Sequence, residues 1–173
     1  MDRSAINAAL FRHHEAFILR VLAVPMDERA LSRNGKWTAA QQIEHILRAV
    51  RPVAMAMRIP KWFLRWRFGK SNRPPRDHDG LVQRYNEKLA AGGRASGRFV
   101  PPPVPAGDVD RIAASLRDTV KILSERVNSW AEHELDTVLL PHPLLGKLTV
   151  REMLFFTIYH VQHHQALVER DTA

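Results

Sequence analysis

The sequence predicts an all-α protein: a four-helix bundle in which a long insertion, rich in proline and glycine, separates the second and third long helices. Three observations favour this fold. Four segments carry apolar residues at helical spacing, no segment shows the alternation of a strand, and no internal repeat or glycine-rich phosphate loop occurs. The 173 residues suit one core, so we expect residues 1–173 to form a single domain.

The first two long helices follow from their apolar stripes and their end signals. The first is expected over about residues 4–23, because Pro25 lies just beyond its end. The second begins after Thr38, which has the spacing to form a capping box with Gln41. Pro52 lies inside this second helix and should bend it or end it there, and we expect the element to continue as a kinked helix.

The insertion covers about residues 59–107 and is broken up by prolines and glycines. One short helix, over about residues 79–91, fits its apolar spacing. The proline-rich stretch 101–105 should be extended polyproline. A connection of this length is typical of a lid or of a cover over a core.

The last two long helices complete the predicted bundle. The third should run over about residues 107–131, with Asp108 or Gly107 as its cap. The fourth should begin at Thr149, which has capping-box spacing to Glu152. This final helix is apolar on most sides, which is typical of a helix that packs on more than one neighbour.

Composition excludes several classes of function. The chain has no cysteine, which rules out disulfides, cysteine-bound zinc, iron–sulfur clusters and a cysteine nucleophile. It shows neither a signal peptide nor an apolar stretch of membrane-spanning length, so we expect a cytoplasmic protein. Twenty-six Lys and Arg against 18 Asp and Glu give a net charge of +8. Much of that excess lies between residues 58 and 76.

Residues 61–68, within this basic stretch, interleave aromatic and basic side chains and allow three interpretations. The segment could cover the bundle with its aromatic rings inward and its arginines outward, which is the interpretation that we favour. It could instead lie on a membrane surface. A third reading is that it binds nucleic acid or an anionic substrate.

The histidines are the strongest chemical signal. His160 and His164 lie four residues apart, so a helix places both rings on one face, where one metal ion can bind both. The same pattern also occurs by chance and in ordinary core or surface pairs. His45 lies in an apolar run of the second helix and is the best candidate for a third ligand. The alternative for His45 is a neutral core histidine that is hydrogen-bonded to an acceptor.

The remaining histidines are weaker candidates. One of His13 and His14 could point inward as a fourth ligand or an outer group, whereas His163 should be rotated off the face shared by its two neighbours. Exposure to solvent is expected for the rest, which are His78, His133 and His142.

Two blocks of the sequence resemble signatures of the DinB-like superfamily. The first is Trp37 followed by the helix that carries His45. The second comprises residues 142–152 and the run from His160 to Gln165. The resemblance covers residues 37–50 and 135–168, and the pair of blocks in this order is far more specific than either block alone.

The resemblance implies a bundle with up-down-down-up helix order and a divalent metal, such as zinc, nickel, iron or manganese, bound by three histidines. Carried over by position, these are His45, His160 and His164. Members of the family include S-transferases and an isomerase that use low-molecular-weight thiols, and many uncharacterised hydrolase-like proteins. Homodimers are frequent. The resemblance fixes neither a substrate nor a reaction.

Two functions from different classes therefore remain open. In the first, a three-histidine site with a free coordination position lowers the pKa of a water or a thiol, and the protein is a metal-dependent hydrolase or thiol S-transferase acting on a small molecule. Gln42 and Gln165 would then orient ligands or substrate, unless they simply face solvent. In the second, the protein is a non-catalytic bundle that binds nucleic acid or an anionic membrane through its basic surface.

Overall fold

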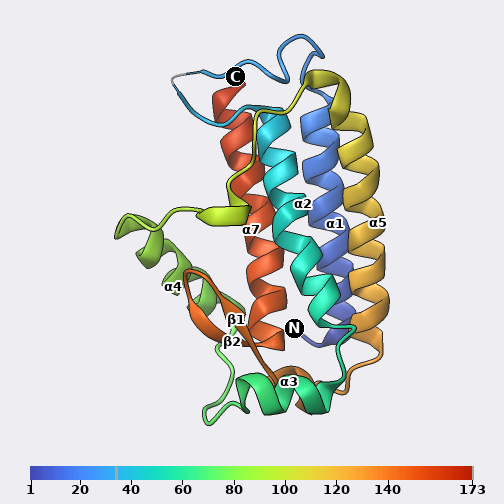
Figure 1. Cartoon of the computed structure of the whole chain (residues 1–173), viewed down its shortest axis with the longest axis vertical. Coiled ribbons are helices and arrows are strands. Elements are labelled where there is room, and N and C mark those ends of the chain that lie inside the picture. Colours follow the sequence, from blue (N-terminus) through green and yellow to red (C-terminus); the bar gives the residue numbers. More distant parts are fainter. Residues whose placement is uncertain (34, 173) are drawn as a thin grey trace.

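A computed structural model describes residues 1–33 and 35–172, which are mostly helical. Four long helices lie side by side (Figure 1). Each of α1 and α2 packs against both α5 and α7. In Figure 1, α1 and α7 run towards the end that holds the C-terminus, whereas α2 and α5 run the opposite way. The bounds of these helices are α1 Arg3–Leu22, α2 Ala39–Ala56, α5 Val109–Asn128 and α7 Val150–Asp171.

The insertion contains two helices between α2 and α5. The expected short helix is present as α4 (His78–Ala90), which packs beside α7. The sequence did not predict α3 (Lys61–Phe68), which lies crosswise at the end of the bundle opposite the C-terminus (Figure 1). Two 3-10 turns follow, at Gly97–Phe99 and Ala106–Asp108.

The interpretation of residues 61–68 as a cover with its aromatic rings inward is wrong for the two tryptophans. Leu64 is fully buried beneath α3, but Trp62 and Trp66 are 69% and 74% exposed. Lys61 and Arg65 face inward instead, because both pair with the carboxylate of Glu134. The burial of Leu64 and this ion pair, both on the inner side of α3, therefore fix which face of the helix meets solvent.

The structure is mostly helical, as expected, but it also contains a small two-stranded sheet that the sequence did not predict. Between α5 and α7 lie the short helix α6 (Glu132–Thr137) and the antiparallel strands β1 (Leu139–His142) and β2 (Gly146–Thr149). Each strand has four residues, which is too short for alternation to be seen in the sequence. Gly146 has a φ of 78°, so the turn needs the left-handed backbone that glycine adopts without steric cost.

The predicted helix starts are confirmed at α2 and α7. Thr38 and Gln41 exchange the two hydrogen bonds of a capping box, and Thr149 and Glu152 do the same. At α5 the expected side-chain cap is absent: Asp108 ends a 3-10 turn with helical backbone angles, and its carboxylate pairs with Arg111. α2 continues through Pro52 to Ala56, so the proline does not end the helix.

The core lies between the four long helices and fixes the inward face of α2. Ile43, Ile46 and Leu47 are all at most 2% exposed, and they surround His45 along the helix. Their burial orients α2 so that His45 points towards α7. Among the residues that the structure describes, no helix is long and apolar enough to span a membrane.

The cap of α2 should make a measurable contribution to stability. Thr38 Oγ1 accepts a hydrogen bond from the backbone N–H of Gln41 at 3.1 Å. Replacing Thr38 by alanine should lower the free energy of unfolding by about 1 kcal/mol, because one N–H at the helix start loses its acceptor. Urea denaturation measures this change. A loss below about 0.3 kcal/mol would show that water replaces the cap without cost.

Candidate metal centre

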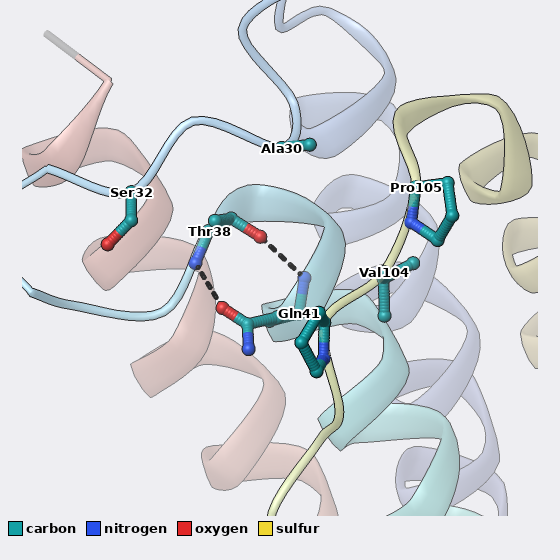
Figure 2. A pocket seen from close by; sticks show the side chains of 7 residues that line it. Ala30, Ser32, Thr38, Gln41, Val104 and Pro105 are labelled. Carbon is teal, nitrogen blue, oxygen red and sulfur yellow. Dashed lines mark hydrogen bonds between the residues drawn. The ribbon is translucent and has the colours of Figure 1, made fainter.

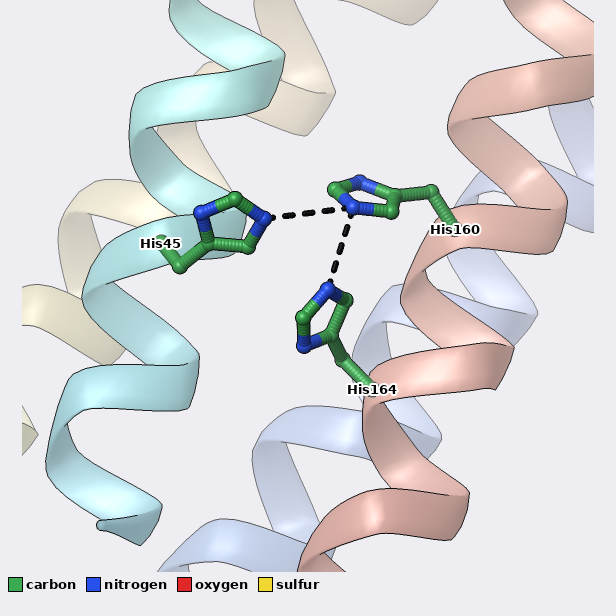
Figure 3. A group of neighbouring side chains, drawn as sticks. All are labelled: His45, His160 and His164. Carbon is green, nitrogen blue, oxygen red and sulfur yellow. Dashed lines mark hydrogen bonds between the residues drawn. The ribbon is translucent and has the colours of Figure 1, made fainter. Parts of the chain in front are cut away.

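Three histidines from two helices meet in the interior. His45 comes from α2, and His160 and His164 come from α7; all three are at most 6% exposed. The Nε2 atom of His160 lies 3.2 Å from Nε2 of His45 and 3.0 Å from Nε2 of His164 (Figure 3). One ligand nitrogen from each ring lies within 4.8 Å of the others. We call His45, His160 and His164 the histidine trio.

The Nδ1 atoms of two trio rings are held by hydrogen bonds from the far side. Nδ1 of His45 donates to the carbonyl oxygen of Phe99 at 2.7 Å. Nδ1 of His164 donates to Oε1 of Gln42, a buried side chain on α2. Each of these bonds places the ring proton on Nδ1 and leaves a lone pair on Nε2 of a neutral ring.

This proton placement makes the trio a poor hydrogen-bonding network by itself. The Nε2 atom of His160 faces two nitrogens that carry lone pairs, and it has at most one proton to offer. Only one of the two short contacts can then be a hydrogen bond. A bound cation would satisfy all three lone pairs at once, so the donor set fits a metal ion.

The spacing of the nitrogens also fits an ion. A zinc-to-nitrogen bond of about 2.0–2.1 Å at a tetrahedral angle separates two ligand nitrogens by about 3.3 Å. The observed separations of 3.2 Å and 3.0 Å are close to that value. Two of the three nitrogen pairs thus already have the spacing of metal ligands, whereas the three nitrogens together are only within 4.8 Å of one another.

Burial keeps the trio in the neutral form that binds metals. Burial, reinforced by the neighbouring rings, lowers the pKa of His160 and of His164 well below the usual value of a histidine. The pKa of His45 is also lowered by burial, although the hydrogen bond to Phe99 opposes this shift. The lowered pKa values favour the neutral rings, which leaves the Nε2 lone pairs of His45 and His164 free to bind a metal.

Aromatic rings surround the trio. The ring of Trp37 lies 4.9 Å from that of His45 and 6.3 Å from that of His164, between centroids. Phe156 stacks on His160 at 4.7 Å, and the ring of Tyr85 from α4 lies 6.1 Å from His160. Burial raises the pKa of Tyr85 to about 12, so its hydroxyl keeps its proton at neutral pH. These walls fix the rings and limit the access of water.

The end of the insertion runs along α2 and contributes backbone to the site. Carbonyl oxygens of Arg98, Phe99 and Pro102 accept hydrogen bonds from Arg48, His45 and Gln41, respectively. A cavity of about 510 Å³ lies beside this stretch, at the start of α2 (Figure 2). Its lining includes Thr38 and Gln41, and Gln41 lies one helical turn before His45.

The structure brings Gln42 to the trio but not Gln165, whose amide donates to Glu169 on the surface of α7. His14 is buried, yet its Nδ1 donates to the carbonyl of Leu10, and the ring is not part of the trio. His163 is half-buried, with its ring 5.3 Å from that of His164, and it is also outside the trio. His13 is half-buried and contacts Arg12.

Two of the three histidines expected in solvent are not exposed. Nδ1 of His142 accepts hydrogen bonds from the backbone N–H groups of Leu144 and Leu145, and its ring packs against Phe156. Burial lowers the pKa of His142 to about 4. His78 is half-buried beside α7, whereas His133 is exposed as expected. The turn between β1 and β2 explains why the His142 ring is held there, because the N–H groups of Leu144 and Leu145 in that turn need an acceptor.

Sequence reasoning missed the Phe99 carbonyl and the walls made by Tyr85 and Phe156. A backbone acceptor has no side-chain signature, so nothing in the sequence could have indicated Phe99. Trp37 did have a signal, since it belongs to the block that resembles the family signature.

A family model described as DinB superfamily matches residues 10–168. The chain belongs to the DinB superfamily. No curated protein and no solved structure matches it. The matched region of this DinB-superfamily chain includes every residue of the trio and the insertion that supplies Phe99.

Proposed function

We propose that this DinB-superfamily protein is a divalent-metal-dependent enzyme, a hydrolase or a thiol S-transferase that acts on a small molecule. His45, His160 and His164 would hold the ion, on a four-helix bundle of up-down-down-up order. The observation that carries the proposal is the convergence of three Nε2 atoms, two of them fixed as lone-pair donors. Zinc, nickel, iron and manganese are the candidate ions, since imidazole nitrogen suits several divalent metals.

The chemistry of such a site depends on the coordination positions that the three histidines leave open on the ion. A divalent ion held by three protein ligands keeps a coordination position for substrate and lowers the pKa of a water or thiol that binds there. The chain has no cysteine, so a protein thiol cannot be the nucleophile. For transfer chemistry the thiol must come from a low-molecular-weight compound.

The protein's own groups then have defined tasks. Phe99 and Gln42 hold the Nδ1 protons of His45 and His164 and so keep both Nε2 lone pairs turned towards the centre. Trp37 and Phe156 hold the rings in place and exclude water from their outer faces. The basic surface that suggested a membrane or nucleic-acid partner belongs to α3 and shares no residue with the trio.

Metal content and metal-dependent turnover test the proposal together. Elemental analysis of the purified protein should find about one divalent metal per chain, since the trio forms a single site. The metal-loaded protein should then hydrolyse chromogenic esters or amides, or transfer a low-molecular-weight thiol to an electrophilic aryl halide. Chelation should abolish that activity. A protein that takes up no zinc, nickel, iron or manganese contradicts the proposal.

Gln42 offers a test of how the ligands are held. Gln42→Leu keeps the size of the side chain but removes the acceptor of the His164 Nδ1 proton. Metal affinity should fall about 10- to 100-fold, as measured by competition with a chromogenic chelator. Gln165→Leu is the matched control, because Gln165 contacts Glu169 and should leave affinity unchanged. Equal losses in both variants would contradict the assigned role of Gln42.

A further inference from the structure

The outer face of α3 carries the largest exposed aromatic side chains among the residues that the structure describes. Trp62 is 69% exposed, Trp66 is 74% exposed and Phe63 is 36% exposed. The ring of Phe63 lies 5.8 Å from that of Trp62 and 5.5 Å from that of Trp66, between centroids, so the three form one cluster. Large rings of this kind are costly to leave in water and mark an interaction surface.

The inner face of α3 shows that this exposure is built into the fold. Leu64 is fully buried, and Lys61 and Arg65 both pair with Glu134. Lys61 also donates to the carbonyl of Ser129 at 3.2 Å. These contacts hold the helix across the end of the bundle (Figure 1). The exposed fractions of Trp62, Phe63 and Trp66 show that the aromatic cluster is turned away from the core.

The stretch of sequence that carries the cluster contains charges of one sign. Residues 45–76 contain nine Lys and Arg and no Asp or Glu. Arg58, Arg67 and Lys70 flank the cluster and are exposed. None of these three forms an ion pair within the described part of the chain. The face therefore combines exposed tryptophan with uncompensated positive charge.

We propose that α3 docks this protein on an anionic lipid surface. Tryptophan prefers the boundary between headgroups and acyl chains, and Lys and Arg are attracted to anionic headgroups. Met55 and Ile59, in the stretch just before α3, are 66% and 36% exposed and add aliphatic surface. The positive charges thus match the anionic headgroups, and the apolar surface matches the upper part of the acyl chains.

The alternatives fit the same surface less well. A second copy of the chain would bring the Arg58, Arg67 and Lys70 of both molecules together, and no acidic residue in 45–76 would offset the repulsion. A nucleic acid would need rings presented as flat stacking platforms. Here Trp62 meets Phe63 at 86°, edge against face, on a helix at the end of the molecule.

Vesicle binding tests the docking without reference to the metal centre. The intact protein should bind vesicles of phosphatidylcholine with phosphatidylglycerol, but not vesicles of phosphatidylcholine alone, and salt should weaken the binding. Tryptophan emission should shift to the blue as Trp62 and Trp66 leave water. Sedimentation with vesicles and fluorescence titration measure the two effects.

Two double variants separate the contribution of the charges from that of the aromatic rings. Arg58→Gln with Arg67→Gln should lower the partition coefficient about 30-fold, at about 1 kcal/mol for each charge near the surface. Trp62→Ser with Trp66→Ser should lower it at least about tenfold and abolish the blue shift. Because all four side chains are exposed, the variants should fold, as the melting temperature will show.

Matched controls remove the same number of positive charges or of exposed apolar side chains elsewhere. Arg12→Gln with Arg111→Gln removes two positive charges away from α3, and Phe11→Ser with Leu19→Ser removes two exposed apolar residues from α1. Both controls should bind vesicles like the parent protein. The proposal is overturned if the tryptophan variant binds equally well. It is also overturned if the parent protein does not bind anionic vesicles. Binding of a single-stranded oligonucleotide, or self-association through α3, in place of vesicle binding would identify the alternative partner.

Discussion

Replacing His160 by alanine should abolish metal binding, with affinity falling by more than the 10- to 100-fold typical of losing an outer partner. His160 is the centre of the trio, because its Nε2 lies within 3.2 Å of the Nε2 atoms of both other rings. The remaining pair would be two imidazoles from different helices. Such a pair is an incomplete ligand set for a catalytic zinc site, which uses three protein ligands.

Thermal melting provides a clear readout of this loss. A metal at 100 times its Kd stabilises the native state by about 2.7 kcal/mol, which raises the Tm of a chain of this size by about 5–10 °C. The parent protein should show that rise with zinc or nickel, and His160→Ala should show none.

His163→Ala is the matched control for His160→Ala. The ring of His163 lies on the same helix but outside the trio, so this variant should keep both the Tm rise and the stoichiometry. Circular dichroism should show that each variant is folded. Stoichiometric metal in His160→Ala would remove the basis of the proposed function.

Replacing Glu152 by alanine should give the largest loss of stability, about 3–5 kcal/mol. The carboxylate is fully buried at the start of α7. Arg73 donates to both of its oxygens, at 2.7 and 2.9 Å, and the backbone N–H groups of Arg76 and Thr149 donate as well. The variant would leave all of these donors without their acceptor, and would free the start of α4 from α7.

The same carboxylate predicts how stability depends on pH. Burial alone would raise the pKa of Glu152, but the hydrogen bonds from Arg73, Arg76 and Thr149 outweigh it and lower the pKa to about 2. A lowered pKa stabilises the fold fully above the ordinary value of 4.5, and the contribution is lost as the pH falls from there through about 2. The contribution is about 3 kcal/mol at neutral pH.

Urea denaturation of the parent and of Glu152→Gln at several pH values tests both statements. The difference in unfolding free energy should be large at pH 7 and should shrink steadily below pH 4.5. Glu169→Ala is the control, because this residue is exposed near the end of α7 and should change stability by less than about 0.5 kcal/mol. A difference that stays constant with pH would show that Glu152 acts through packing alone.

Local signals accounted for much of the helical structure. The capping boxes at Thr38 and Thr149 depend on residues three apart, so the sequence contains the whole motif. The spacing of His160 and His164 likewise needs only a helix to place both rings on one face. The short strands β1 and β2 were missed because four residues give too little alternation to recognise.

The exposure of α3 shows where local reasoning fails. The run of Trp, Phe and Leu over residues 61–68 suggested a buried cover. Whether a ring faces the core depends on which side of the helix is anchored, and Glu134, far along the chain, anchors the side of Lys61 and Arg65. The periodicity of residues 61–68 gives no indication that Glu134 is their partner.

By itself, the sequence determined the helical character of this protein, the starts of two long helices and the pairing of His160 with His164, because each depends on neighbours within a turn or two. The family resemblance implied that His45 joins this pair, but only the tertiary structure decided that the Phe99 carbonyl and Gln42 fix the ring protons, and that Trp62 and Trp66 face outward. These features depend on how distant segments pack, and packing brings together atoms whose separation along the chain carries no local signal.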